Sequence, residues 1–412
     1  MTVSIPENIA STPLSFFQRL TLATGVDTRM MSMVAALVLI WGCFWVIEPN
    51  FLTARNFWNL AVQSSVVAIM ATGMVLVIVI RHIDLSVGSI LGLVSMMAAV
   101  LQVQIFTAGA AWSTPVTIIC CLFLGTLLGA WQGLWVAYLG VPSFVVTLGG
   151  LLVFRGLAWQ ATKGQTIAPM EDSFQKLIGG GIDGGIGAGP SWVVGVLAMV
   201  LVVVFTIIAR KRRRRFGFPI KPMAGEIFML VLRLTMIAGF VYLMNSYPRP
   251  GSDVGQGIPK PAIILITVVI IMEFIARMTR FGRYVFAIGG NPEAALLAGI
   301  NTRRVTVYVF SLMGFLAGLA GLITTARLNA GANSAGELAE LSVIAAAVIG
   351  GTSLAGGIGT ITGAIIGAIL MESLRNGMLL IGLPSPLQNV IIGFVLMFAV
   401  WADVVYQRRR AA

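Results

Sequence analysis

Residues that commonly carry out catalysis are scarce in this sequence. His82 is its single histidine, and Cys43, Cys120 and Cys121 lie inside apolar runs without the spacing of a metal site. No nucleophile lies beside an evident base, and the chain has no Gly-x4-Gly-Lys-Ser/Thr segment that would cradle a nucleotide phosphate. The sequence therefore argues against an enzyme, and we expect no catalytic residue, bound cofactor or bound metal.

A short segment inside the basic loop 277–304 carries strong helix signals. Asn291 suits the N-cap, Pro292 the first helical position and Glu293 the positive end of the dipole, while Gly299 suits a left-handed stop. A helix of about seven residues is unstable alone in water, where roughly 12–15 are needed. An ordinary surface helix is the alternative, but the segment is unusually apolar, so we expect it to lie on a partner subunit. The contact residues would be Asn291, Pro292, Glu293, Ala294, Ala295, Leu296, Leu297 and Gly299.

Two groups of charges lie at or within apolar runs. Asp84 either serves function, as buried membrane carboxylates often do, or pairs structurally with Arg81 or caps a helix, and we favour the structural role. Glu226 and Arg233, two helical turns apart, are expected to join Glu273 in a buried structural charge network.

Composition identifies the elements that must position these residues. The 412 residues are 58% hydrophobic and 10% charged, whereas soluble domains have roughly 25% charged residues. At about 20 apolar residues per crossing, the chain predicts an all-α transmembrane bundle of about 10–12 spans. Its net charge is +12. The excess basic residues lie between apolar runs, where they fix the orientation in the membrane, so we expect no nucleic-acid partner.

The charge-free intervals predict where the chain crosses the membrane. We expect the segment 341–371 to be a broken-helix hairpin, because it is too short for two full crossings and its glycine-rich middle would lie deep in the protein. A short echo between Gly88-Ser89-Ile90 and Gly356-Gly357-Ile358 suggests a duplicated architecture, or only the frequent use of small residues. The predicted crossings are 31–47, 57–80, three within 85–154, 191–209, 226–244, 261–276, 305–326 and 387–402, with a loop over 156–190.

The distribution of basic residues predicts the orientation. With the N-terminus in the cytoplasm, 18 of the 27 basic residues fall on the cytoplasmic side. We therefore expect both termini to be cytoplasmic, with one domain over 1–412. It would consist of a cytoplasmic segment 1–30, a membrane domain 31–404 and a cytoplasmic loop 277–304.

Three motifs together resemble the permeases of ABC importers. The stretch Ala287–Gly299 is similar to their coupling segment, although the downstream part of that motif is not visible. The stretches Ile83–Ser89 and Val348–Thr360 resemble the monosaccharide branch, which takes ribose, xylose or arabinose. Within this branch the length and the sequence Arg81-His82-Ile83-Asp84 look most like D-xylose permeases.

The resemblance implies a homodimer in a bacterial inner membrane. It would bind two cytoplasmic ATPase subunits, which hold ATP-Mg, and receive sugar from an extracytoplasmic binding protein, with lipid around it. The segment Pro292–Ala298 would pass the ATPase movement to the membrane helices.

A neutral sugar needs transient hydrogen bonds along its path. The small and polar residues expected to line the path are Gln63, Ser64, Ser65, Asp84, Ser86, Gly88, Ser89, Gly350, Gly351, Thr352, Ser353, Gly356 and Gly357. Two alternatives stay open: an ion-coupled secondary sugar transporter, or the same permease type with ribose, another sugar or a nucleoside as substrate.

Overall fold

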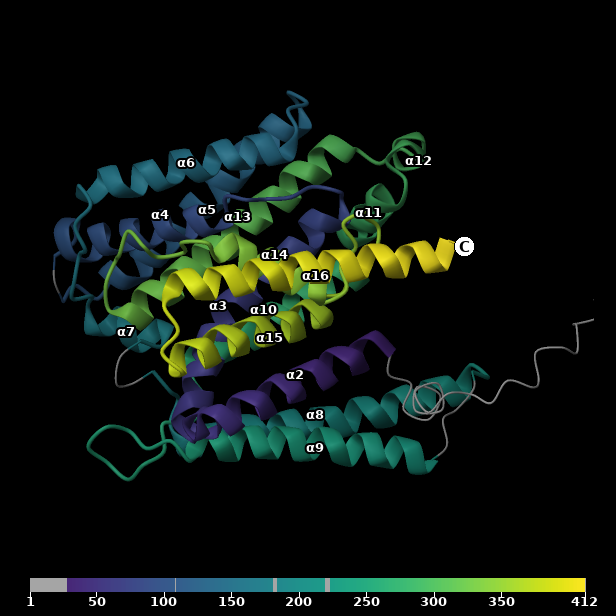
Figure 1. The fold of residues 1–412 in the computed structure, drawn as a ribbon, viewed down its shortest axis with the longest axis horizontal. Coiled ribbons are helices and arrows are strands. Elements are labelled where there is room, and N and C mark those ends of the chain that lie inside the picture. Colours follow the sequence, from purple (N-terminus) through teal and green to yellow (C-terminus); the bar gives the residue numbers. More distant parts are fainter. Residues whose placement is uncertain (1–27, 108, 181–183, 219–222, 412) are drawn as a thin grey trace, which may run out of the picture.

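The computed structural model describes residues 28–107, 109–180, 184–218 and 223–411, so most of the predicted segment 1–30 lies outside it. Within these ranges the chain folds into helices and contains no β-strand beyond isolated bridges, which confirms the predicted all-α class (Figure 1). Ten of the described helices are long and apolar enough to cross a membrane. The chain is therefore a multi-pass membrane protein.

The predicted crossings correspond to observed helices, although several extend beyond the apolar run. The predicted loop 156–190 is shorter than expected, because one helix continues to Thr162 and another occupies Asp172–Ile178. The elements are α2 (Thr28–Ile47), η2 (Pro49–Leu52), α3 (Ala54–Val79), α4 (Val87–Ala99) continued by η3 (Val100–Ile105), α5 (Ser113–Ala137), α6 (Ser143–Thr162), α7 (Asp172–Ile178), α8 (Ala188–Arg215), α9 (Met223–Asn245), α10 (Lys260–Met278), α11 (Arg280–Gly290), α12 (Pro292–Leu297), α13 (Thr302–Leu328), α14 (Ala339–Ile349), α15 (Ile361–Leu380) and α16 (Ser385–Ala411).

The long helices lie roughly alongside one another, so the bundle has two ends (Figure 1). Helix α7 lies at one end, and α11 and α12 lie at the other. These are named the α7 end and the α12 end below.

Helix α13 lies against α3, α4 and α5, and glycines allow its closest approach to α5. A methyl group on Gly129 of α5 would lie 2.1 Å from the carbonyl oxygen of Phe310. One on Gly314 of α13 would lie 2.1 Å from the carbonyl oxygen of Gly125. Membrane helices have little hydrophobic drive to associate, so this backbone contact supplies the packing that holds the pair together.

Two irregular segments lie inside the bundle, before α4 and before α14. Residues 80–86 lead from the α12 end into α4, and residues 329–338 lead from the α7 end into α14. The segments meet where Gly336, with φ +71°, lies against Gly88. Arg155 of α6 donates hydrogen bonds of 2.8 Å to the carbonyl oxygens of Asn333 and Ala335. These bonds satisfy backbone acceptors that no helix satisfies, as buried irregular backbone requires.

The predicted broken hairpin is wrong in its depth and in its second arm. The glycine-rich loop 350–360 lies at the α12 end, where the amide of Gly357 donates to the carbonyl oxygen of Val79 over 3.0 Å. Helix α15 has full spanning length, because it continues through Glu372 and Arg375, whose charges end the apolar run. The irregular backbone inside the bundle is instead that of 80–86 and 329–338.

The proposed echo between two glycine motifs does not reflect equal local structure. Gly88-Ser89-Ile90 belongs to the first turns of α4, whereas Gly356-Gly357-Ile358 lies in the loop before α15. The repeated small residues therefore serve different backbone conformations.

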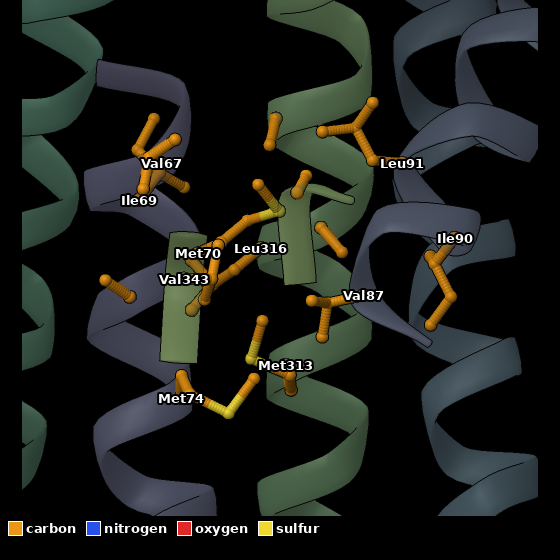
Figure 2. Packing of buried hydrophobic residues seen from close by; sticks show 14 of the residues in the cluster. Val67, Ile69, Met70, Met74, Val87, Ile90, Leu91, Met313, Leu316 and Val343 are labelled. Carbon is orange, nitrogen blue, oxygen red and sulfur yellow. The ribbon is translucent and has the colours of Figure 1, made fainter. Parts of the chain in front are cut away.

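Apolar side chains fill the space between α3, α4, α13 and α14. Figure 2 shows them pointing toward one another from the four helices. The labelled residues are Val67, Ile69, Met70, Met74, Val87, Ile90, Leu91, Met313, Leu316 and Val343, and all are buried.

Candidate functional site

The short helix predicted in the loop 277–304 is present as α12. The side chain of Asn291 accepts a hydrogen bond from the backbone N–H of Ala294 over 3.0 Å, as an N-cap does. Pro292 occupies the first helical position, Glu293 lies in the first turn, and Gly299 has the left-handed φ of +83°. The sequence thus determined both ends of this helix locally.

One side of α12 faces the bundle and the other faces outward. Ala295 is 4% exposed and is the only buried residue of the helix, whereas Leu296 is 62% and Leu297 is 88% exposed. Two neighbouring leucines on a six-residue helix give an apolar surface that none of the described residues covers. Such a surface fits a groove on another protein.

Arg81 ties the end of α3 to the start of α12. Its backbone is left-handed, with φ +65°, and its side chain reaches across to α11. Nε donates to the carbonyl oxygen of Gly289 and an Nη atom donates to that of Gly290, both over 2.9 Å. Because Gly290 directly precedes Asn291, these bonds fix the base of α12 to α3.

Beside Arg81, three backbone segments come into direct contact. A methyl group on Gly289 would lie 2.0 Å from the carbonyl oxygen of Val79 and 2.6 Å from the amide nitrogen of Gly357. We call Val79, Arg81, Gly289, Gly290 and Gly357 the Gly289 junction. It joins α3, α11 and the loop 350–360 through direct backbone contacts and through the side chain of Arg81. These backbone contacts leave no room for a side chain between the three segments.

The predicted ion pair between Arg81 and Asp84 is not formed. One carboxylate oxygen of Asp84 accepts hydrogen bonds from the backbone N–H of Ser86 over 2.9 Å and from its hydroxyl over 2.6 Å. The other oxygen has no hydrogen-bond partner among the described residues. Asp84 shapes the turn before α4 rather than capping it, since α4 begins at Val87 with Ser86 at its N-cap. Arg81 is directed away because its side chain is bound at the Gly289 junction.

The residues predicted to line a sugar path lie at three levels of the bundle. The structure does not gather them in one cavity, and apolar side chains occupy the space between the levels (Figure 2). Their role in transport stays a prediction. Gln63, Ser64 and Ser65 lie in the half of α3 nearer the α7 end; Asp84, Ser86, Gly88 and Ser89 lie where the irregular segments meet; Gly350, Gly351, Thr352, Ser353, Gly356 and Gly357 lie in the loop at the α12 end.

The predicted charge network around Glu226 is also not formed. Glu226 forms an ion pair with Arg210 of α8 rather than with Arg233 of its own helix. Glu273 pairs with Arg277, one helical turn away. Spacing along one helix could not reveal that Glu226 faces α8.

Sequence reasoning also missed three residues that organise the site. Arg155 holds the segment 329–338, Gly289 makes the closest contact of the junction, and buried Glu340 lies against Gly88. The available signals were the single charge that ends the charge-free run before Arg155 and the glycine pair that precedes Asn291. Neither signal indicates which segment of the chain Arg155 or Gly289 contacts.

Comparisons with known proteins agree over nearly the whole chain. Residues 56–400 match the family model described as branched-chain amino acid transport system / permease component. The xylose transport system permease protein XylH of Escherichia coli K12 is 40% identical over 93% of this chain and 94% of its own. XylH of Haemophilus influenzae is also 40% identical, over 92% and 96%. The ribose import permease protein RbsC of Escherichia coli K12 is 34% identical over 90% and 92%. No solved structure matches.

Proposed function

Because this chain belongs to the family of ABC importer permeases, on its sugar-transporting branch, we propose that its substrate is the pentose D-xylose. It is a transport subunit and not an enzyme, as its relatives are permeases. The identity of 40% with xylose permeases over nearly the full length supports the choice of sugar. Ribose is the second candidate, since the ribose permease is 34% identical.

In this proposal the α12 end lies in the cytoplasm of a bacterium and both termini lie on that side. The positive-inside bias supports this orientation, because the basic end of α8 and the basic loop 277–304 lie at the α12 end. The single transmembrane domain forms a homodimer. It works with two cytoplasmic ATPase subunits, which bind ATP-Mg, and with an extracytoplasmic sugar-binding protein.

The observation that supports the proposed coupling to an ATPase is the outward-facing apolar side of α12. Leu296 and Leu297 are exposed on a helix that is too short to be stable alone, yet Asn291 caps it and Ala295 seats it. Helix α12 is therefore preformed, and its outward apolar side can bind in a groove on an ATPase subunit.

The Gly289 junction connects α12 to α3 and to the loop 350–360. When ATP closes the ATPase pair, α12 moves, and the junction carries that movement to α3 and to the loop 350–360. The loop carries Thr352 and Ser353, and α3 carries Gln63. Since apolar side chains fill the centre of one copy, the sugar passes along the surface between two copies.

Replacing Leu297 by aspartate tests the proposed contact between α12 and the ATPase subunit. The change puts a charge into the proposed contact, and loss of one well-seated anchor costs about 2 kcal/mol or more, roughly a 30-fold loss of affinity. We expect ATP-driven xylose uptake to fall about tenfold or more in proteoliposomes that contain the ATPase and the binding protein. The midpoint of thermal unfolding should stay unchanged, because Leu297 is exposed.

The matched control is Leu297→Met, which keeps an apolar side chain of similar size and should retain uptake. Normal uptake by Leu297→Asp would refute the proposed contact between α12 and the ATPase subunit. Uphill uptake by the permease alone, with a proton gradient and without ATP, would instead identify a secondary transporter.

A further inference from the structure

Helices α8 and α9 lie side by side at the edge of the molecule (Figure 1). Only Ser191 and Gly195 of α8 and Val241 and Met244 of α9 are buried. All four lie toward the α7 end, where Val241 and Met244 pack with Trp58. The halves of α8 and α9 near the α12 end are therefore exposed to the bilayer.

Between these exposed halves lies a cavity of about 400 Å³. Its walls are apolar along part of their length, with Val202 and Phe205 from α8 and Met229 and Leu230 from α9. Another part of the lining is charged. Arg210, Arg213, Glu226 and Arg233 contribute to it.

The charges of this cavity do not cancel. Glu226 forms an ion pair with Arg210, whereas Arg213 and Arg233 form no ion pair with a described carboxylate. The side chains of these two arginines also make no hydrogen bond with another described residue. The cavity thus joins an apolar groove to two uncompensated guanidinium groups.

The position of Arg233 indicates which anion it meets. It lies ten residues along α9 from Met223, about 15 Å from the end of the helix. An arginine at this depth is costly in hydrocarbon unless it reaches the interface or finds an anion. Side chains on a helix tilt toward its N-terminus, so Arg233 extends toward the α12 end and toward Arg213.

We propose that this cavity binds an anionic phospholipid from the leaflet at the α12 end. The phosphate of the headgroup lies between Arg213 and Arg233, and an acyl chain lies along Val202, Phe205 and Met229. A soluble anion does not combine these two contacts. The proposed orientation makes this the cytoplasmic leaflet, which is rich in anionic lipid, but the binding itself does not depend on the sugar transported.

The site is tested by lipid binding to the full-length protein purified in neutral detergent. Native mass spectrometry with phosphatidylglycerol and with phosphatidylcholine gives both affinities. We expect the protein to prefer phosphatidylglycerol, and the double variant Arg213→Gln/Arg233→Gln to bind it about 30-fold more weakly. The matched control Lys211→Gln/Arg214→Gln removes the same charge from the same region, but neither residue lines the cavity, so a loss below about threefold is expected.

Three results would overturn the proposal. Equal weakening by both double variants would mean general attraction to a basic helix end, and no weakening by either would mean that the cavity is not used. Competition by glycerol 3-phosphate as strong as that of the intact lipid would mean a phosphate site without an acyl groove. If the double variant does not fold, Arg213→Gln alone, on the exposed end of α8, should weaken binding about fivefold, and an unchanged affinity there would refute the site.

Discussion

The pairs α5–α13 and α8–α9 both consist of neighbouring membrane helices, but they pack in opposite ways. Gly125 and Gly129 of α5 meet Gly314 of α13 at backbone distance, and most of α13 is buried. Helix α8 has the most apolar window of the ten candidate spans, yet only 6% of that window is buried. Hydrophobicity thus places a helix in the membrane, whereas small residues at helical spacing determine which helices pack tightly.

The difference also separates two roles. The pair α5–α13 is held by backbone contacts that leave no room for an added side chain. The pair α8–α9 packs against the rest of the molecule at the α7 end, and its other half is not buried. Substitutions in the two regions should therefore differ in size and in kind.

The largest effect is expected for Gly129→Ala. The added methyl group would lie 2.1 Å from the carbonyl oxygen of Phe310, so α5 and α13 must separate. We expect a loss of about 3 kcal/mol, measured as a fall of roughly 3–4 °C in the midpoint of thermal unfolding. Gly149→Ala is the control, since no atom lies within 4 Å of that position, and it should cause no loss. Equal effects of the two variants would contradict the tight contact.

An intermediate effect, on transport rather than on stability, is expected for Arg81→Ala. The variant loses two hydrogen bonds to the residues that precede α12, each contributing about 1 kcal/mol or less because the side chain of Arg81 is exposed. ATP-driven uptake in proteoliposomes should fall about tenfold, because α12 then moves without carrying α3 with it. Arg280→Ala, an exposed arginine at the same end, should leave uptake near normal. A decrease of the same size in both variants would remove the junction from the mechanism.

The smallest effect is expected for Glu226→Gln in the α8–α9 pair. The change breaks the ion pair with Arg210, which is partly exposed and contributes about 1 kcal/mol or less. The midpoint of thermal unfolding should therefore shift by no more than about 1 °C. A loss as large as that of Gly129→Ala would show that the pair is packed as firmly as the core, and the comparison would fail.

The amino-acid sequence by itself determined the membrane class, the approximate crossings and the helix α12. Transfer of apolar residues into a bilayer depends on each segment's own composition, so spans can be predicted one at a time. The ends of α12 are equally local, because Asn291 bonds to the backbone of Ala294 and Gly299 adopts its own left-handed conformation.

The tertiary structure decided which distant residues meet. Arg81 could have paired with Asp84, and Glu226 with Arg233, but backbone direction and helix rotation brought Gly289 and Arg210 to them instead. The loop 350–360 lies at the α12 end because α15 continues as a helix past Glu372, which an apolar count could not foresee. Contacts between segments far apart in the chain depend on the packing of every helix between them, and composition and spacing do not contain that information.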